Sequence, residues 1–309
     1  MKLASQKFAS QVFLAALAAL LAASATAQTL YAVSVRTYSD PGYRGVEGNL
    51  YVVDPETATT TLVAPLMVSG RTPIGLRGLA IHPKTGVFYG ITSPNASSIP
   101  RSLVTVDPTT GSVSPVGDLG YGASDIEFDS DGILYAWVPE TRQVGTVNLD
   151  SGAVTLRGEP LPRGALKGSL LFSGNGQALV ASTGGTGTLD TVDLATGQVT
   201  TGPTLTGAPF PDFIGGLCYS PKGELFAINS SLGRSTQANL INIDPKTGKI
   251  TNLGALPNDT ESLAFGPSAI EHKDMFDSIM QWRLPVLGAL FLFAVVVLVV
   301  TMWPTKKKG

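Results

Sequence analysis

Residues 103–116 read LVTVDPTTGSVSPV, two short β-prone runs joined by a tight turn. Val and Thr dominate the first run and Val and Ser the second, and β-branched residues such as Val and Thr are typical of strands. In the turn, Asp107 can hydrogen-bond its own backbone, Pro108 fixes its φ angle, and Gly111 accepts a positive φ. The segment therefore predicts a β-hairpin.

The same hairpin pattern occurs five times along the chain. The copies are VVDPETAT at 52–59, TVDPTTGS at 105–112, TVNLDSGA at 146–153, TVDLATGQ at 191–198 and NIDPKTGK at 242–249. A second pattern, an apolar strand, alternates with the hairpin at steps of 47, 44, 47 and 46 residues. It opens at Leu79, Ile126, Leu170, Leu217 and Leu263. A period of this length is typical of a repeat architecture.

Each repeat contains four strands in a fixed order. The apolar strand passes through a tight turn into a second strand, a loop of variable length leads to a third, and the D-P-x-T-G turn leads to a fourth. The first turn needs a residue with positive φ, which glycine supplies. The glycines at that position are Gly86, Gly132, Gly176 and Gly223. Four antiparallel strands in roughly 46 residues predict one blade of a β-propeller.

The two ends of the repeat region complete each other. The last copy of the apolar strand, at residues 262–266, has no blade after it, whereas residues 30–35, 49–53 and 60–63 form a blade that lacks its first strand. Joining them predicts an all-β fold, a five-bladed β-propeller closed by the N- and C-terminal strands in one composite blade. Such a ring leaves no open sheet edge.

With these blades, the chain resembles the bacterial exported β-propeller repeat proteins of the LYxVDPxTG type, which are similar to YVTN and NHL propellers. The resemblance covers about residues 30–267. It implies the propeller fold and says little about function, because propellers host binding scaffolds, lyases, hydrolases and sensors. Asn148 in place of the turn aspartate and Leu194 in place of the proline depart from the stricter pattern.

The N-terminal segment predicts export. Residues 1–27 carry two lysines, then an apolar stretch, then the small residues Ala25-Thr26-Ala27, which is typical of a cleaved signal peptide. The alternative is a retained N-terminal membrane helix.

The C-terminal segment predicts a membrane anchor. Residues 284–303 contain no charge and, as a transmembrane helix, are long enough to cross a bilayer. Residues 304–309 include three lysines, which predicts a basic cytoplasmic tail. Residues 268–283 are then a juxtamembrane stalk, and residues 28–267 an ectodomain on the periplasmic or extracellular side. The alternative is a sorting signal that is later removed.

Composition excludes several classes of function. Residues 28–278 carry fifteen Lys and Arg against 23 Asp and Glu, a formal charge of minus eight, which argues against nucleic-acid binding. Cys218 is the only cysteine, so intrachain disulfides and thiolate metal clusters are excluded, and its apolar strand predicts a buried thiol. Of the two histidines, His82 is expected to be a turn residue and His272 belongs to the stalk, which argues against a catalytic triad or a histidine metal site. We expect no cofactor and no metal.

Strand direction predicts two different faces. The two kinds of tight turn are expected on one side, the turn face, and the long irregular segments on the other, the loop face. Nearly all arginines of the ectodomain map to the loop face, and guanidinium groups suit carboxylates and phosphates. The candidate binding residues are Arg36, Arg44, Arg71, Arg77, Arg101, Arg142 and Arg163, with Lys167, Asp125 and Glu261 near the mouth of the channel. The alternative is that these groups form ordinary ion pairs with neighbours such as Asp118 and Glu140.

These features predict a membrane-anchored extracytoplasmic propeller that acts as a binding or scaffold module. The loop face would bind a protein partner or an anionic ligand, for example as an accessory subunit of a membrane assembly, with the turn face nearer the lipid. The alternative is an extracellular lyase or hydrolase that acts on a sugar or lactone at the channel mouth. An acidic residue with a perturbed pKa there would favour the enzyme.

Overall fold

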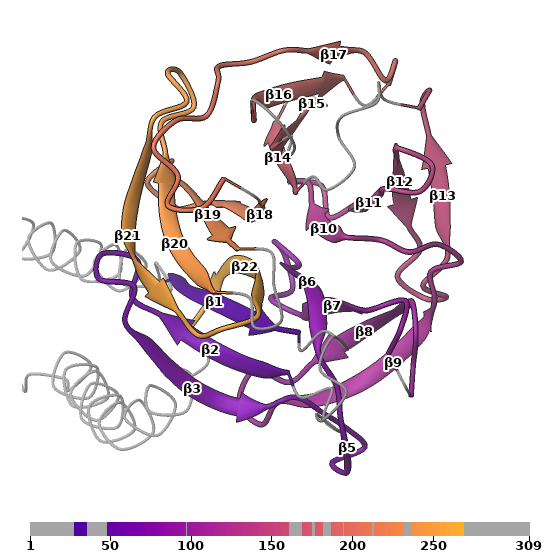
Figure 1. Cartoon of the computed structure of the whole chain (residues 1–309). Helices are drawn as coiled ribbons and strands as arrows, with labels where there is room; N and C mark the ends of the chain where they lie inside the picture. The colour runs from indigo at the N-terminus through magenta and orange to yellow at the C-terminus, as the bar shows by residue number, and fades with distance from the viewer. Residues whose placement is uncertain are drawn as a thin grey trace, which may run out of the picture. The chain divides into compact units, whose positions relative to one another are not determined.

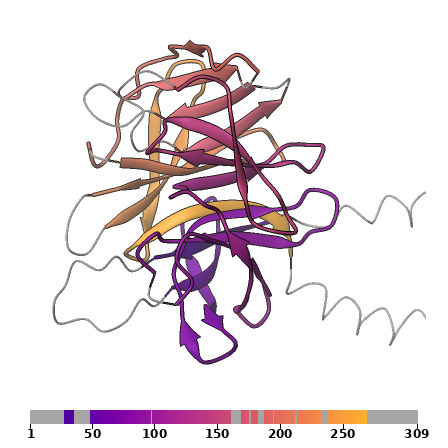
Figure 2. The same cartoon turned by 90° about the vertical axis from the view of Figure 1, so that its right-hand side faces the viewer.

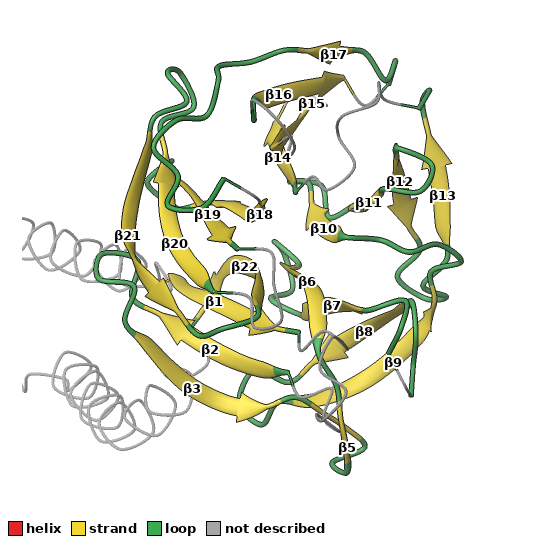
Figure 3. Ribbon diagram, in the orientation of Figure 1, coloured by secondary structure: helices red, strands yellow, loops and turns green. Residues whose placement is uncertain are grey.

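The computed structural model describes residues 28–35, 48–96, 98–160, 169–174, 177–181, 187–193, 195–211, 213–231 and 237–268. These residues form 22 strands in five sheets arranged around a common centre, as Figure 1 shows. The ribbon in Figure 3 contains strands and loops in this part of the chain. No helix of the described residues is long and apolar enough to cross a membrane. The proposed signal peptide, anchor and tail, and nearly all of the stalk, lie outside the described residues.

Each sheet is one blade, and its strands follow one another from the centre outward (Figure 1). Blade 1 consists of β6 (Leu76–Ile81), β7 (Phe88–Thr92), β8 (Ser102–Val106) and β9 (Ser112–Asp118). Blade 2 consists of β10 (Asp125–Phe128), β11 (Leu134–Val138), β12 (Gln143–Val147) and β13 (Val154–Arg157). Blade 3 consists of β14 (Leu170–Gly174), β15 (Gln177–Ala181), β16 (Leu189–Asp193) and β17 (Val199–Thr200). Blade 4 consists of β18 (Phe213–Tyr219), β19 (Leu225–Ser230), β20 (Ala238–Ile243) and β21 (Ile250–Leu256).

Blade 5 is the composite blade, and its existence is confirmed. Its strands are β22 (Thr260–Pro267), β1 (Gln28–Ser34), β2 (Asn49–Val53) and β3 (Thr60–Pro65), in this order. β22 pairs antiparallel with β1 from the Gln28–Pro267 pair to the Val33–Ser262 pair. The innermost strand of this blade therefore comes from the end of the propeller sequence and the other three from its beginning.

The aspartate of the D-P-x-T-G turn holds the turn through its side chain. Asp107 Oδ1 accepts hydrogen bonds from the backbone N–H groups of Thr109 (2.8 Å) and Thr110 (3.2 Å). Asn148 Oδ1 accepts the equivalent two bonds in blade 2, so this substitution preserves the turn. The hydroxyl and backbone N–H of Thr109 also hold the pKa of Asp107 below its ordinary value, because they stabilise the ionised form.

The outermost strands follow the circumference of the ring (Figures 1 and 2). Each D-P-x-T-G turn thereby meets the end of the preceding blade: Met67 N donates to Gly111 O (3.0 Å), and Thr206 N donates to Gly248 O (3.0 Å). The sequence predicts both kinds of tight turn on one side. The outer turn of blade 5 (Pro55, Glu56) lines one pocket with the first turn of blade 4 (Ser220, Pro221, Lys222), in line with this prediction. The right-handed twist across the four strands sets the outer turns toward the rim of that side.

A small hairpin, β4 (Met67–Val68) and β5 (Thr72–Pro73), extends blade 1 outward where the sequence predicted a loop. Its turn places Ser69 at φ 52° and Gly70 at φ 67°. Two consecutive positive φ angles are typical of a type I′ turn, whose twist matches that of paired strands. β4 pairs in parallel with the start of β9, so the hairpin belongs to the rim.

Apolar side chains fill the spaces between adjacent blades. One cluster joins blades 4 and 5 and includes Phe226, Leu240 and Leu263. Between blades 5 and 1, the buried rings of Tyr31 and Phe88 meet edge to face at 4.8 Å. The blades are thus held by contacts between sheets, which fixes the loops at both ends of the central axis.

Candidate functional site

The innermost strands approach one another closely at one level of the axis. The residues at this level precede the apolar opening residue of each blade, and they are Gly78, Asp125, Ser169, Gly216 and Ser262. Hydrogen bonds link the blades here: Leu79 N donates to Ser262 Oγ and Leu217 N to Ser169 Oγ, both at 3.0 Å.

Asp125 belongs to this level rather than to the loop surface. Its carboxylate accepts a short hydrogen bond from Ser169 Oγ, and the residue is only 4% exposed. The Asp125 side chain therefore links blades 2 and 3. The sequence predicts Asp125 near the mouth of the channel, and the structure places its carboxylate against Ser169 of the adjacent innermost strand region.

Arg77 and Glu261 occupy β-bulges on the neighbouring innermost strands β6 and β22. Residues on either side of Arg77 pair with adjacent residues of β7, and Glu261 is skipped in the same way in the pairing of β22 with β1. A bulge re-aims the extra residue and is common beside functional sites. Arg77 is half-buried, and its Nε is enclosed without a hydrogen-bond partner among the described residues.

Arg101 and Arg142 hold equivalent places on the loop face, next to the third strand of adjacent blades. Both have positive φ angles, 49° and 57°, a backbone conformation that residues other than glycine rarely adopt. Arg101 forms an ion pair with Asp118 at 3.2 Å. For Arg142 no carboxylate of a described residue lies at ion-pair distance, and Glu140 accepts a hydrogen bond from Gly122 N. The ion-pair alternative thus holds for Arg101.

Arg71 lies apart from these residues. It follows the turn of the β4–β5 hairpin at the rim, where its N–H donates to Val68 O (3.1 Å). β5 stands at the edge of the ring in Figure 1. Four further candidates lie outside the described residues: Arg36, Arg44, Arg163 and Lys167. The structure therefore brings Arg77, Glu261 and Asp125 onto innermost strands, and it places Arg71, Arg101 and Arg142 farther from the axis.

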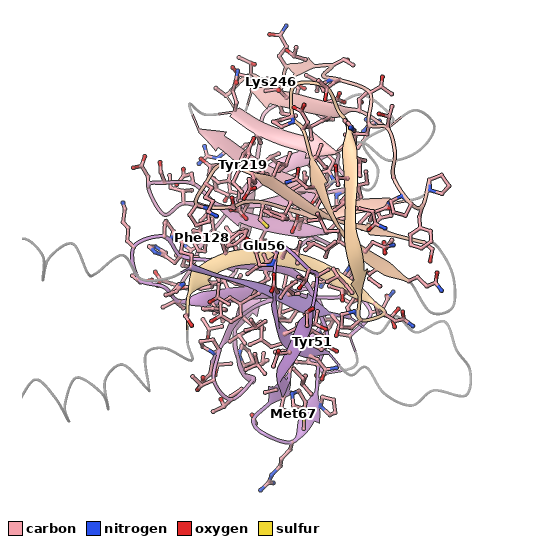
Figure 4. All side chains as sticks on the ribbon, turned by 90° about the vertical axis from the view of Figure 1, so that its left-hand side faces the viewer. Tyr51, Glu56, Met67, Phe128, Tyr219 and Lys246 are labelled. Atoms are coloured by element: carbon pink, nitrogen blue, oxygen red, sulfur yellow. The ribbon has the colours of Figure 1, made fainter. Side chains whose placement is uncertain are left out.

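A cavity of about 740 Å³ occupies the turn-face end of the axis. Every blade contributes a residue of its innermost strand to the wall: Ile81, Glu127, Leu171, Cys218 and Ala264. The first turns of blades 1 and 2 form the rim, together with Gln28 at the start of β1. Phe128 and Tyr219, which also line the cavity, are labelled in Figure 4.

Glu127 is the functional candidate that the sequence analysis missed. It is half-buried and lines the cavity, and its carboxyl group has no hydrogen-bond partner among the described residues. Burial raises the pKa of Glu127 well above its ordinary value, and the negative charge of Asp125 adds to this effect. A signal was present in the repeat alignment, since the equivalent residues are Ala80, Leu171, Cys218 and Ala264.

The residues around Glu127 are acidic or aromatic. Tyr135 and Asp129 line the cavity beside it, and burial raises the pKa of the Tyr135 hydroxyl. Burial also raises the pKa of the Cys218 thiol well above its ordinary value, and the charges of Glu127 and Asp125 contribute. Cys218 is buried, as the sequence predicted.

His82 serves as a turn residue, as predicted. Its Nδ1 accepts from the backbone N–H groups of Lys84 and Thr85, both at 3.2 Å. Asp129 and Ser220 accept backbone N–H groups in the equivalent turns of blades 2 and 4. These side chains shape the cavity rim by fixing the first turns.

No protein-family model matches the chain, and no curated protein matches it. Solved structures resemble the chain at low identity, each with a TM-score below 0.5. A chain of the nidogen/laminin complex has 10% identity and a TM-score of 0.48, covering 78% of this chain and 98% of that one. A protein of unknown function from Bacteroides caccae has 14% identity and a TM-score of 0.44, covering 78% and 100%. TolB from Acinetobacter baumannii has 14% identity and a TM-score of 0.42, covering 74% and 53%.

Proposed function

We propose that this protein is a membrane-anchored extracytoplasmic propeller that binds an acidic surface of a partner protein through its loop face. The partner's carboxylates would meet the arginines of that face, with Arg77 at the centre and Arg142 farther out. A small polyanion would satisfy the same groups, so a soluble polycarboxylate should compete with the partner.

The observation that carries this proposal is the environment of the Arg77 side chain at the loop-face end of β6. A buried polar atom without a hydrogen-bond partner costs stability, and such groups are rare in folded proteins. Among the described residues the Nε of Arg77 has no hydrogen-bond partner, and the bulge in β6 lies at this residue. A carboxylate from a partner would pair with the guanidinium group of Arg77.

The membrane part of the proposal rests on the sequence. The uncharged run at 284–303 would be the anchor and residues 304–309 the cytoplasmic tail. β22 ends at Pro267 on the turn face. We propose that the loop face is the surface that the partner meets. A tethered propeller of this kind would suit an accessory subunit of a larger membrane assembly.

The test is a pull-down of the tagged full-length chain from membranes in a gentle detergent, followed by mass spectrometry. We expect a stoichiometric acidic partner, with loss of capture for Arg77→Ala and competition by citrate. The matched control is Arg157→Ala, because Arg157 is exposed and its Nε donates to Thr146 within its own blade. Undiminished capture by an Arg77→Ala/Arg142→Ala variant would refute the proposal.

One observation favours the second candidate, an extracellular lyase or hydrolase acting on a sugar or lactone. A carboxyl group with a raised pKa can act as a general acid, and burial raises the pKa of Glu127. This site is in the cavity rather than at the loop-face mouth. Turnover of a glycoside or lactone panel that disappears in Glu127→Gln would favour the enzyme, and turnover unchanged in that variant would exclude this site.

A further inference from the structure

The cavity at the turn face has the chemistry of a cation site. Its described lining contains the carboxyl side chains of Glu127, Asp129 and Asp131, and no Lys or Arg. It also contains the aromatic residues Phe128, Tyr135, Tyr219 and Phe265. Carboxylates attract a cation directly, and aromatic faces attract it through the ring quadrupole.

The protein's own contacts at the rim support this interpretation. Lys84 Nζ donates to the backbone carbonyl of Asp131 at 2.7 Å, so an ammonium group already rests on the rim turn. Asp129 uses Oδ1 to accept the backbone N–H groups of Asp131 and Ile133, which fixes its carboxylate at the rim. Glu127 lies deeper, on the innermost strand, without a hydrogen-bond partner in the described part of the chain.

A metal ion fits the lining less well than an organic cation. Calcium takes six to eight oxygen ligands. Within the described residues no group of three His, Cys, Asp or Glu side chains is arranged to hold a metal. A volume of about 740 Å³ is also far larger than an ion requires and is in the range of small-molecule sites.

We infer that the turn-face cavity binds a small organic cation, an amine or quaternary ammonium compound, with the half-buried Glu127 in its wall as the counter-ion. This inference is independent of the loop-face proposal, because the two sites lie at opposite ends of the axis. An experiment that refutes one of the two proposals therefore does not refute the other.

Binding by this route is expected to release a proton. Burial raises the pKa of Glu127, and a cation beside the carboxyl group would stabilise its ionised form and so lower that pKa. The other titratable groups near Glu127 are Asp125 on its own strand, Cys218 and Tyr219 on β18, Tyr135 on β11 and the rim aspartates. Burial raises the pKa values of Cys218, Tyr135 and Tyr219, which favours their neutral forms.

The test uses the full-length chain in detergent and two probes of almost the same shape. Choline carries a quaternary ammonium group, and 3,3-dimethyl-1-butanol replaces its nitrogen with carbon. Calorimetry in buffers of different ionisation enthalpy measures both the affinity and the protons released. We expect choline to bind at least about tenfold more tightly than the alcohol, with affinity rising with pH while Glu127 remains protonated.

Variants connect the binding to the carboxyl group. Glu127→Gln should lose the preference for choline and the proton release, whereas Glu224→Gln should keep both, since Glu224 is exposed outside this cavity. Circular dichroism establishes that each variant is folded. Equal affinity for both probes, choline binding unchanged in Glu127→Gln, or binding of neither choline nor 1,4-diaminobutane at millimolar concentration would each overturn the inference.

Discussion

Replacement of Glu127 by Gln should change how the stability of the propeller depends on pH. The pKa of Glu127 is raised in the folded protein, so the folded state holds a proton that the unfolded state releases above the ordinary value of 4.5. Glu127 therefore destabilises the fold increasingly as pH rises above 4.5. The free energy of unfolding continues to fall until the pH passes the pKa of Glu127 in the folded protein. Above that pH this group no longer changes it.

The size of the effect follows from linkage. One proton of difference between folded and unfolded states changes the free energy of unfolding by about 1.4 kcal/mol per pH unit. Gln has nearly the same shape and does not titrate, so Glu127→Gln should be the more stable protein at neutral pH. The turn aspartates do not mask the effect, because their lowered pKa values act below 3.8.

Urea denaturation of the full-length chain in detergent measures this difference. Trp137 is fully buried in blade 2, so its fluorescence reports unfolding of the propeller. The wild-type and Glu127→Gln curves should diverge above pH 4.5, while Glu224→Gln follows the wild type. Parallel curves for Glu127→Gln and the wild type over about pH 4 to 8 would refute the assigned burial of this carboxyl group.

Two further substitutions test the turns and the inter-blade links. Asp107→Ala should lower the free energy of unfolding by about 1 kcal/mol, because two backbone N–H groups lose their acceptor. Asp107→Asn should keep most of the wild-type stability, because Asn148 accepts the equivalent hydrogen bonds in blade 2. Equal losses in urea denaturation would show that the side-chain acceptor is unimportant. Ser169→Ala should cost more than Ser262→Ala, roughly 2 to 4 against 1 to 3 kcal/mol, since Ser169 serves both Leu217 and Asp125. A larger loss for Ser262→Ala would contradict the linkage described for blades 2 to 4.

The repeat and the ring closure could be predicted from sequence because both depend on local patterns. The first-turn glycines Gly86, Gly132 and Gly223 have positive φ angles of 69°, 91° and 82°, as the turn chemistry requires. The composite blade followed from counting strands, and the pairing of Gln28 with Pro267 confirms it.

The remaining features depend on three-dimensional geometry. The twist of a blade accumulates across its strands, so the hydrogen bonds between a D-P-x-T-G turn and the preceding blade could not be derived from the repeat pattern. The β4–β5 hairpin requires a positive φ at Ser69, which serine rarely supplies without tertiary support. The roles of Asp125 and Glu127 differ although they are two residues apart on the same strand. One meets Ser169, and the other lines a cavity that exists only when five blades assemble.

The closure of the ring by both ends of the propeller can be measured with one engineered disulfide. Gln28 and Pro267 are directly paired in β1 and β22, and paired residues of adjacent strands lie within disulfide range. In the folded full-length chain, Gln28→Cys/Pro267→Cys should oxidise to an intrachain disulfide. The control variant Gln28→Cys/Asp150→Cys should form no intrachain disulfide, because it places one cysteine in blade 5 and the other in a turn of blade 2. A double-cysteine protein that stays reduced at 28 and 267, or cross-links no faster than the control pair, would contradict a five-bladed ring closed by a composite blade.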